Sequence, residues 1–296
     1  MTDQSPPPGW QPPPPPPPPS GPPAASGPPP EPHSEVRSDE RTPLDHVRSP
    51  YGLLIALATV LIFIAPNLLV LAFDGFADGP GTTALPEGPE LIVGLVITIA
   101  LQLIVFSLSL LPLLIAGRPF RRLLGPTRAT GLMWAIGLGV GIVTVIVTYT
   151  VNAVFVLSFG DGEAVEQEVL DIALAGGAAT VLAILLAVVL APVTEEIVFR
   201  GVLFRALDEK FGMWPAAVLS SAVFAVIHFE VLFSQPLALA GLFTVGILLA
   251  IAYHRTGSLL VPILGHAVFN AVSVGLALLV DQLDLASSWW PTLPGA

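Results

Sequence analysis

The stretch APVTEEIVFRGVLFR, residues 191–205, lies at the end of a long apolar run, and ahead of its last residue, Arg205, it brings three ionisable side chains into that run. Glu195 and Glu196 are adjacent, and Arg200 follows Glu196 by four residues. An ionisable side chain inside a membrane helix costs about 2.5–3.5 kcal/mol on insertion scales, so such residues are functional candidates by default. If the run crosses a membrane, this stretch decides both the fold class and where chemistry takes place.

The composition of the chain is typical of a multi-pass membrane protein. Hydrophobic residues make up 53% of the 296 residues, charged residues only 11%, and the mean hydropathy is +0.80. Several apolar runs reach the length of about 20 residues that crosses a hydrocarbon core. Because cysteine is absent, the candidate site chemistry comes from His, Asp, Glu and Asn. No basic stripe is present to meet phosphates, so we expect no nucleic-acid partner.

Residues 1–50 differ sharply from the rest of the chain. They contain 19 of the 32 prolines, including the unbroken run Pro12–Pro19, and almost nothing that could form a core. This composition predicts a disordered, polyproline-type tail on the cytoplasmic side. The tail has no apolar segment of the kind found in signal peptides. We favour a solvated spacer, with a docking arm for a Pro-binding module as the alternative.

Hydropathy and charge predict an all-α membrane bundle of about seven helices, within a range of six to eight, over residues 51–296. The first four spans are expected over residues 51–73, 91–116, 129–159 and 178–210. After a turn at Gly212, a fifth span includes residues 220–230, a sixth ends at Arg255, and a seventh covers about 258–280. The basic loop GRPFRRLLGPTR, residues 117–128, is expected to be cytoplasmic by the positive-inside rule. The glycine-rich third span suits close contact between helices.

Five polar residues besides Arg200 lie within the expected spans, namely Glu195, Glu196, His228, His266 and Asn270. Glu195 lies 17 residues before Gly212 and His228 lies 16 residues after it. At about 1.5 Å per residue, both are about 25 Å from that turn, so they should face each other in an antiparallel helix pair. His266 shares this level only if its helix begins deeper or if the fourth and fifth helices protrude into the cytoplasm.

The spacing within each helix places these residues in pairs. Glu196 and Arg200 have the i, i+4 spacing of a helical ion pair, and His266 and Asn270 project to one side of their helix. Each pair alone is compatible with helix packing, because buried ion pairs, histidines and asparagines also join membrane helices. Burying the whole set without compensation would cost several kcal/mol, which favours a functional site.

The order E-E-x-x-x-R, then F-x-x-x-H, then H-x-x-x-N on successive membrane helices resembles the CPBP family of intramembrane proteases, also called Abi. This family includes enzymes that trim prenylated CAAX proteins and enzymes that process bacteriocins. Phe224 and His228 fill the second motif, and the stretch SLLVPILGHAVFN, residues 258–270, is also similar around the third. The resemblance covers about residues 178–280.

The resemblance implies an intramembrane endopeptidase that hydrolyses a peptide bond of a membrane-embedded or lipidated protein, as in CAAX-type or leader-peptide processing. Glu195, facing His228, would activate a water molecule. His266 and Asn270 would donate hydrogen bonds to the oxyanion. Glu196, Arg200 and Phe224 would have supporting roles.

Two mechanisms remain open at this point. His228, His266 and Glu195 could bind zinc with water as the fourth ligand. A metal-free, glutamate-dependent reaction is favoured, because Asn is an unusual zinc ligand. The H-E-x-x-H motif of another class of membrane metalloprotease is absent.

Two other functions compete with proteolysis. In a proton-coupled transporter the buried carboxylates and histidines would form a relay, but such proteins are often built from internal repeats, which this sequence lacks. A non-catalytic membrane scaffold would recruit partners through the proline-rich tail. In each case we expect an integral protein of the lipid bilayer, located in the plasma membrane.

Overall fold

The computed structural model describes residues 52–74, 88–117, 131–159, 176–228 and 238–282, together with Gln11, Pro14 and Pro16. The predicted disorder of the tail and the predicted cytoplasmic side of the basic loop therefore fall mainly on residues outside this set. Regular structure within the described residues is entirely helical, which confirms the all-α fold class. All of these helices lie within the unit Arg41–Ala296.

The described helices follow the predicted spans closely. They are α1 (Leu53–Asp74), α2 (Pro89–Ser109), α3 (Leu111–Ile115), α4 (Gly131–Phe159), α6 (Gly177–Ile184), η3 (Leu185–Leu190), α7 (Ala191–Glu196), η4 (Ile197–Phe204), α8 (Arg205–Phe211), α9 (Met213–Val226), α11 (Ala238–Thr256) and α12 (Leu260–Gln282). Five apolar segments in the described ranges are long enough to cross a membrane, and Leu53–Pro66 and Met213–Val226 form two shorter apolar helices. Together they correspond one to one with the seven predicted spans.

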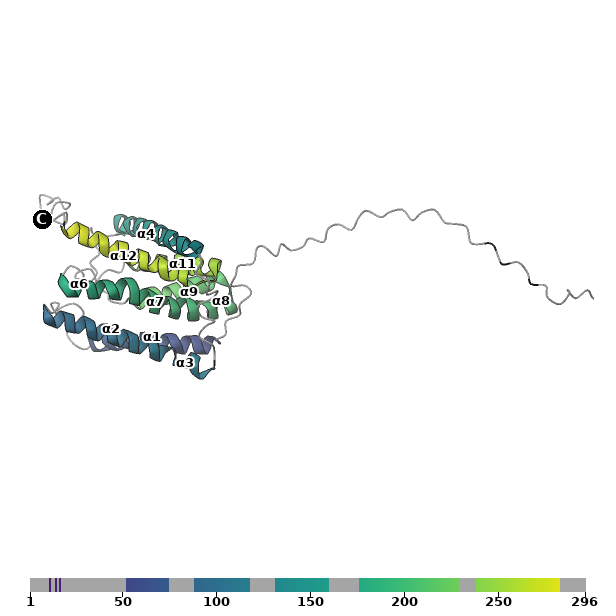
Figure 1. The fold of residues 1–296 in the computed structure, drawn as a ribbon, viewed down its shortest axis with the longest axis horizontal. Coiled ribbons are helices and arrows are strands. Elements are labelled where there is room, and N and C mark those ends of the chain that lie inside the picture. The colour runs from purple at the N-terminus through teal and green to yellow at the C-terminus, as the bar shows by residue number, and fades with distance from the viewer. Residues whose placement is uncertain are drawn as a thin grey trace, which may run out of the picture. The chain divides into compact units, whose positions relative to one another are not determined.

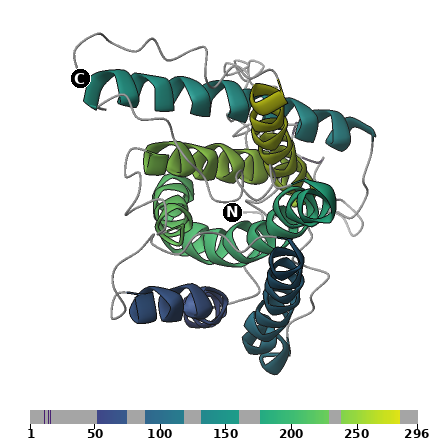
Figure 2. The same cartoon turned by 90° about the vertical axis from the view of Figure 1, so that its left-hand side faces the viewer.

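The elements from α6 to α8 form one continuous helix over residues 177–211, which we call the composite helix. Two stretches of it, η3 and η4, have the wider π-helical winding that frequently occurs at functional sites. Every residue of η4 is buried. Figure 1 shows the composite helix between α1 and α2 on one side and α11 and α12 on the other, with α4 beyond α12. The end-on view in Figure 2 shows the same central position.

Glycines allow α4 and α12 to approach closely, as the composition of the third span predicted. A Cβ atom on Gly137 would lie 2.8 Å from Cβ of Leu264, and one on Gly141 would overlap Val268. Gly137 and Gly141 are four residues apart, which is the G-x-x-x-G spacing of close membrane-helix pairs. α4 therefore packs closely against α12, the helix that carries His266.

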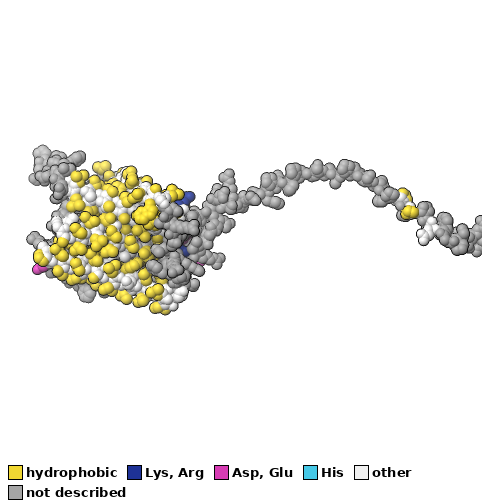
Figure 3. Space-filling view, viewed as in Figure 1, with side chains coloured by type: hydrophobic (Ala, Val, Ile, Leu, Met, Phe, Trp, Pro, Cys, Tyr) yellow, Lys and Arg dark blue, Asp and Glu magenta, His cyan; other side chains and the backbone are white. Residues whose placement is uncertain are grey.

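The outer surface of the bundle is apolar. Figure 3 shows hydrophobic side chains over most of the visible face of the described helices. Among the most exposed are Leu54 on α1, Ile115 on α3 and Leu157 on α4. Water would not favour such a surface, whereas lipid tails would, so the chain is an integral membrane protein.

Candidate active site

Glu196 and Arg200 form a fully buried ion pair at the junction of α7 and η4. Arg200 Nη1 lies 2.8 Å from Glu196 Oε1, and the two side chains are 1% and 0% exposed. Arg200 Nη2 donates a second hydrogen bond, 3.1 Å long, to the carbonyl of Gly246 on α11. The guanidinium carbon also lies 4.7 Å from the centre of the Phe224 ring on α9. The predicted pair is confirmed, and it joins three helices.

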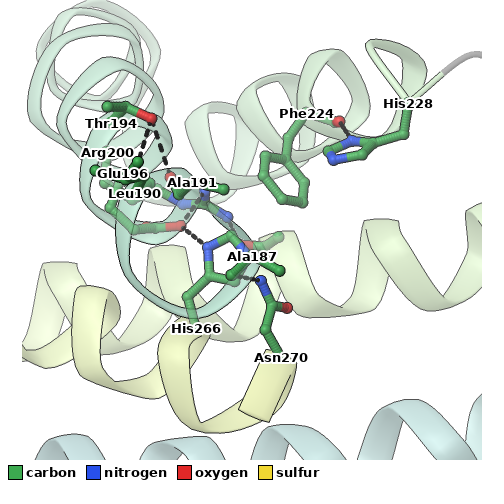
Figure 4. Close-up of polar contacts among 11 residues, drawn as sticks. Ala187, Leu190, Ala191, Thr194, Glu196, Arg200, Phe224, His228, His266 and Asn270 are labelled. Atoms are coloured by element: carbon green, nitrogen blue, oxygen red, sulfur yellow. Dashed lines mark hydrogen bonds and ion pairs between the residues drawn. The ribbon is translucent and has the colours of Figure 1, made fainter. Parts of the chain in front are cut away.

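The carboxylate of Glu196 also contacts the first histidine of the third motif. His266 Nδ1 lies 3.0 Å from the same Oε1 atom that accepts from Arg200. Because this ionised oxygen accepts, Nδ1 of His266 carries the hydrogen, and Nε2 is left for other partners. Glu196 therefore orients His266 as well as neutralising Arg200, a link that the sequence did not predict (Figure 4).

His228 follows the C-terminal end of α9 and is half-buried. Its Nδ1 lies 2.9 Å from the carbonyl oxygen of Phe224. A carbonyl can only accept, so Nδ1 donates and Nε2 is the basic nitrogen of the neutral ring. Figure 4 shows the Phe224 ring between the two histidines, with centroid distances of 5.1 Å to His228 and 5.8 Å to His266.

Asn270 lies one turn after His266 on α12 and reaches the composite helix. Its Nδ2 donates a hydrogen bond of 2.7 Å to the carbonyl of Ala187 in η3. An amide carries two N–H donors, so this bond uses one of them and leaves the other available for a further partner. His266 and Asn270 thus form two successive links from α12 to the composite helix (Figure 4).

Glu195 is buried, with 9% of its surface exposed. Its Oε2 atom is buried without a hydrogen-bond partner among the described residues. A buried carboxylate oxygen in this condition is available for water or substrate. No hydrogen bond joins Glu195 to His228 within the part of the chain that the structure describes, so their pairing stays a prediction. Arg200 and Phe224, which lie twelve residues on either side of Gly212, are in contact, so the composite helix and α9 face each other at that depth.

One polar residue near the carboxylates was missed from the sequence. Gln102 on α2 donates a hydrogen bond of 3.0 Å from Nε2 to the hydroxyl of Thr194, which immediately precedes Glu195. The Thr194 hydroxyl in turn donates to the carbonyl of Leu190 at 2.9 Å. Gln102 fixes α2 at the level of the carboxylates. The signal was present, because an amide within an apolar span is itself a functional candidate.

The described side chains do not fit a zinc site. Among them, no group of three or more His, Asp or Glu residues is arranged so that it could hold a metal ion. The set His228, His266 and Glu195 therefore lacks the convergence that tetrahedral zinc requires.

Comparison with known proteins shows that the segment containing the site is similar to a protease family. Residues 177–272 match the family model described as Type II CAAX prenyl endopeptidase Rce1-like. This range contains all three motifs and nearly coincides with the predicted catalytic core at 178–280. The resemblance to the CPBP family is thereby confirmed for this segment.

Similar proteins are found in two bacteria. A Bacillus subtilis (strain 168) protein named "Putative membrane peptidase YdiL" is 34% identical over 119 residues, which cover 39% of this chain and 45% of the relative. An Escherichia coli protein named "Uncharacterized 24.3 kDa protein" is 35% identical over 98 residues, or 32% of this chain and 43% of the relative. The chain thus spans less than half the length of these relatives. No solved structure shows a significant match.

Proposed function

We propose that this chain is an intramembrane endopeptidase of the CPBP type, which hydrolyses a peptide bond of a membrane-embedded or lipidated substrate. The observation that carries this proposal is the buried cluster in which Glu196 joins Arg200 to His266 while Phe224 separates His266 from His228. The match of the same residues to a type II CAAX prenyl endopeptidase model supports it. CAAX-type processing and leader-peptide processing are the two substrate classes that fit.

Glu195 is the proposed general base. Its unpartnered Oε2 can take a proton from a water molecule, whose oxygen then forms a bond to the substrate's carbonyl carbon. Nε2 of His228, left basic by the hydrogen bond at Nδ1, can hold that water through its second hydrogen. When the C–N bond breaks, the proton on Glu195 passes to the leaving amine nitrogen. Atoms and charge balance without a cofactor.

His266 and Asn270 are the proposed donors to the oxyanion. With Nδ1 directed at Glu196 3.0 Å away, His266 presents Nε2 to the oxyanion, and Nε2 donates when both ring nitrogens carry a hydrogen. The buried cluster then contains two carboxylates, one guanidinium and one imidazolium, so its charges cancel. Charge balance matters because an uncompensated buried charge is strongly destabilising. Asn270 supplies its second N–H.

The competing functions are less well supported. A proton-coupled transporter would also need buried carboxylates and histidines, but the segment that contains them matches an endopeptidase model. A metal-free mechanism is preferred over a zinc mechanism on the donor arrangement described above. For location we propose the plasma membrane with the proline-rich tail in the cytoplasm, where it acts as a spacer or binds a Pro-binding module.

The proposal is tested with purified protein in lipid vesicles and a membrane-tethered peptide substrate. Glu195→Gln and His228→Ala should abolish cleavage while the proteins remain folded. Glu90→Gln is the matched control, since Glu90 is an exposed carboxylate at the start of α2. Full activity in either site variant would contradict the proposal, and loss of activity on chelation together with stoichiometric zinc would replace the metal-free mechanism.

A further inference from the structure

A proline interrupts the backbone hydrogen bonds of the composite helix near the junction of η3 and α7. The N–H of Ala191 bonds to the carbonyl of Leu186, five residues earlier, which is the π-helical spacing. The next residue is Pro192, which has no N–H. Continued in the same spacing, the missing bond would have ended on the carbonyl of Ala187. Pro192 therefore leaves that carbonyl without its backbone donor.

A side chain from another helix takes the place of the missing donor. Asn270 Nδ2 lies 2.7 Å from the carbonyl oxygen of Ala187, a residue that is only 9% exposed (Figure 4). An unsatisfied backbone group in the membrane interior costs several kcal/mol, so this hydrogen bond is worth forming. The carbonyl that lacks a backbone donor because of Pro192 is thus the carbonyl to which Asn270 of α12 donates.

We propose that Pro192 is a positioning residue of the candidate site and acts through Asn270. By withholding its N–H, Pro192 presents the Ala187 carbonyl to α12, and the bond to that carbonyl fixes the amide plane of Asn270. The direction of the second N–H of Asn270 is then fixed as well. The same proline lies one helical turn before Glu195 and Glu196, so the carboxylates and the amide are held in register.

The link has two parts that can be separated by experiment. The replacement of a backbone donor by Asn270 follows from the hydrogen bonds alone. Its catalytic consequence rests on the proposed function. Stability measurements test the first part, and kinetic measurements test the second.

The stability test compares Asn270→Leu in the native protein with the same change in Pro192→Ala. In the native protein the apparent melting temperature should fall by about 2–12 °C, because the Ala187 carbonyl loses its partner. In Pro192→Ala the fall should largely disappear, since the restored N–H of residue 192 can bond to that carbonyl. Pro66→Ala, which removes a proline inside α1, is the control and should leave the effect of Asn270→Leu unchanged. If Asn270→Leu lowers the melting temperature equally in the native protein and in Pro192→Ala, the proposal is overturned.

The kinetic test uses Pro192→Ala by itself. This variant should be at least as stable as the native protein, yet kcat should fall about tenfold with KM unchanged, because a misplaced catalytic group is costly even when present. A proline with a merely structural role would leave kcat unaltered, and that result would overturn the positioning role. If Glu195→Gln proves fully active, the proposed function fails instead, while the melting-temperature comparison still decides whether Pro192 and Asn270 are coupled. Asn270→Ala replaces the leucine variant if the latter does not fold.

Discussion

Glu196→Gln should destabilise the protein far more than Glu195→Gln, although the two residues are neighbours. The change keeps the size of the Glu196 side chain and removes its charge. The side chain is 0% exposed, and its Oε1 accepts from Arg200 Nη1 at 2.8 Å and from His266 Nδ1 at 3.0 Å. The variant leaves Arg200 charged in a place that water does not reach, and its acceptors are then two neutral oxygens, that of the introduced amide and the carbonyl of Gly246.

The size of the effect follows from this burial. Removing one partner of a buried ion pair costs about 3–5 kcal/mol. With about 2–4 °C of melting temperature per kcal/mol for a domain of about 150–250 residues, the fall should be about 6–20 °C. Glu195→Gln removes no hydrogen bond from Oε2 among the described residues, so its fall should stay below about 4 °C. Replacing both charges, as Glu196→Leu with Arg200→Met, should recover most of the loss.

Intrinsic fluorescence during heating in detergent micelles measures these differences, since the chain contains five tryptophans. Cleavage of a membrane-tethered peptide is measured on the same samples below their melting temperatures. Similar melting temperatures for Glu195→Gln and Glu196→Gln would contradict this prediction. So would a double variant that is no more stable than Glu196→Gln.

Three further predictions concern contacts around the site. Gln102→Leu should lower stability by about 0.5–1.5 kcal/mol in thermal unfolding, because α2 loses its hydrogen bond to Thr194; no change would show that this bond does not hold α2. Gly141→Ala should lower stability by about 1–3 kcal/mol because its Cβ would overlap α12, whereas Gly139→Ala, with open space around its Cβ, should be neutral or stabilising. Equal effects of the two glycine variants would contradict the close packing. Phe224→Leu should lower kcat by more than its loss of thermal stability accounts for, because the ring that separates the histidines also faces the buried guanidinium. An unchanged kcat would contradict a positioning role for the ring.

The spans were predictable because length and hydropathy are properties of the sequence alone. The third span, expected over residues 129–159, is α4 at Gly131–Phe159, and the seventh, expected over about 258–280, is α12 at Leu260–Gln282. The π-helical windings of η3 and η4 were not predicted. They depend on which backbone groups pair, and apolar periodicity does not report a change in that pairing.

The candidate site was predictable from the sequence where its contacts join residues close in sequence. The i, i+4 spacing of Glu196 and Arg200 predicted their ion pair. The contact between Arg200 and Phe224 was not itself predicted, although both residues lie twelve residues from Gly212. The bond between Glu196 and His266 joins residues 70 apart in sequence, so it depends on the axial offset of two helices. The helices that carry these two residues are not joined by a single turn, so counting residues does not give their axial offset. The hydrogen bond from Asn270 to the Ala187 carbonyl could not be predicted for the same reason.

The proposed role of Glu195 is to activate a water molecule that hydrolyses a peptide bond within the membrane. Its most direct test is mass spectrometry of a membrane-tethered peptide after incubation with the protein in water enriched in oxygen-18. We expect cleavage with one heavy oxygen in the new carboxyl terminus, and no such product with Glu195→Gln. An intact peptide with the native protein, or labelled product at the native rate with Glu195→Gln, would contradict it.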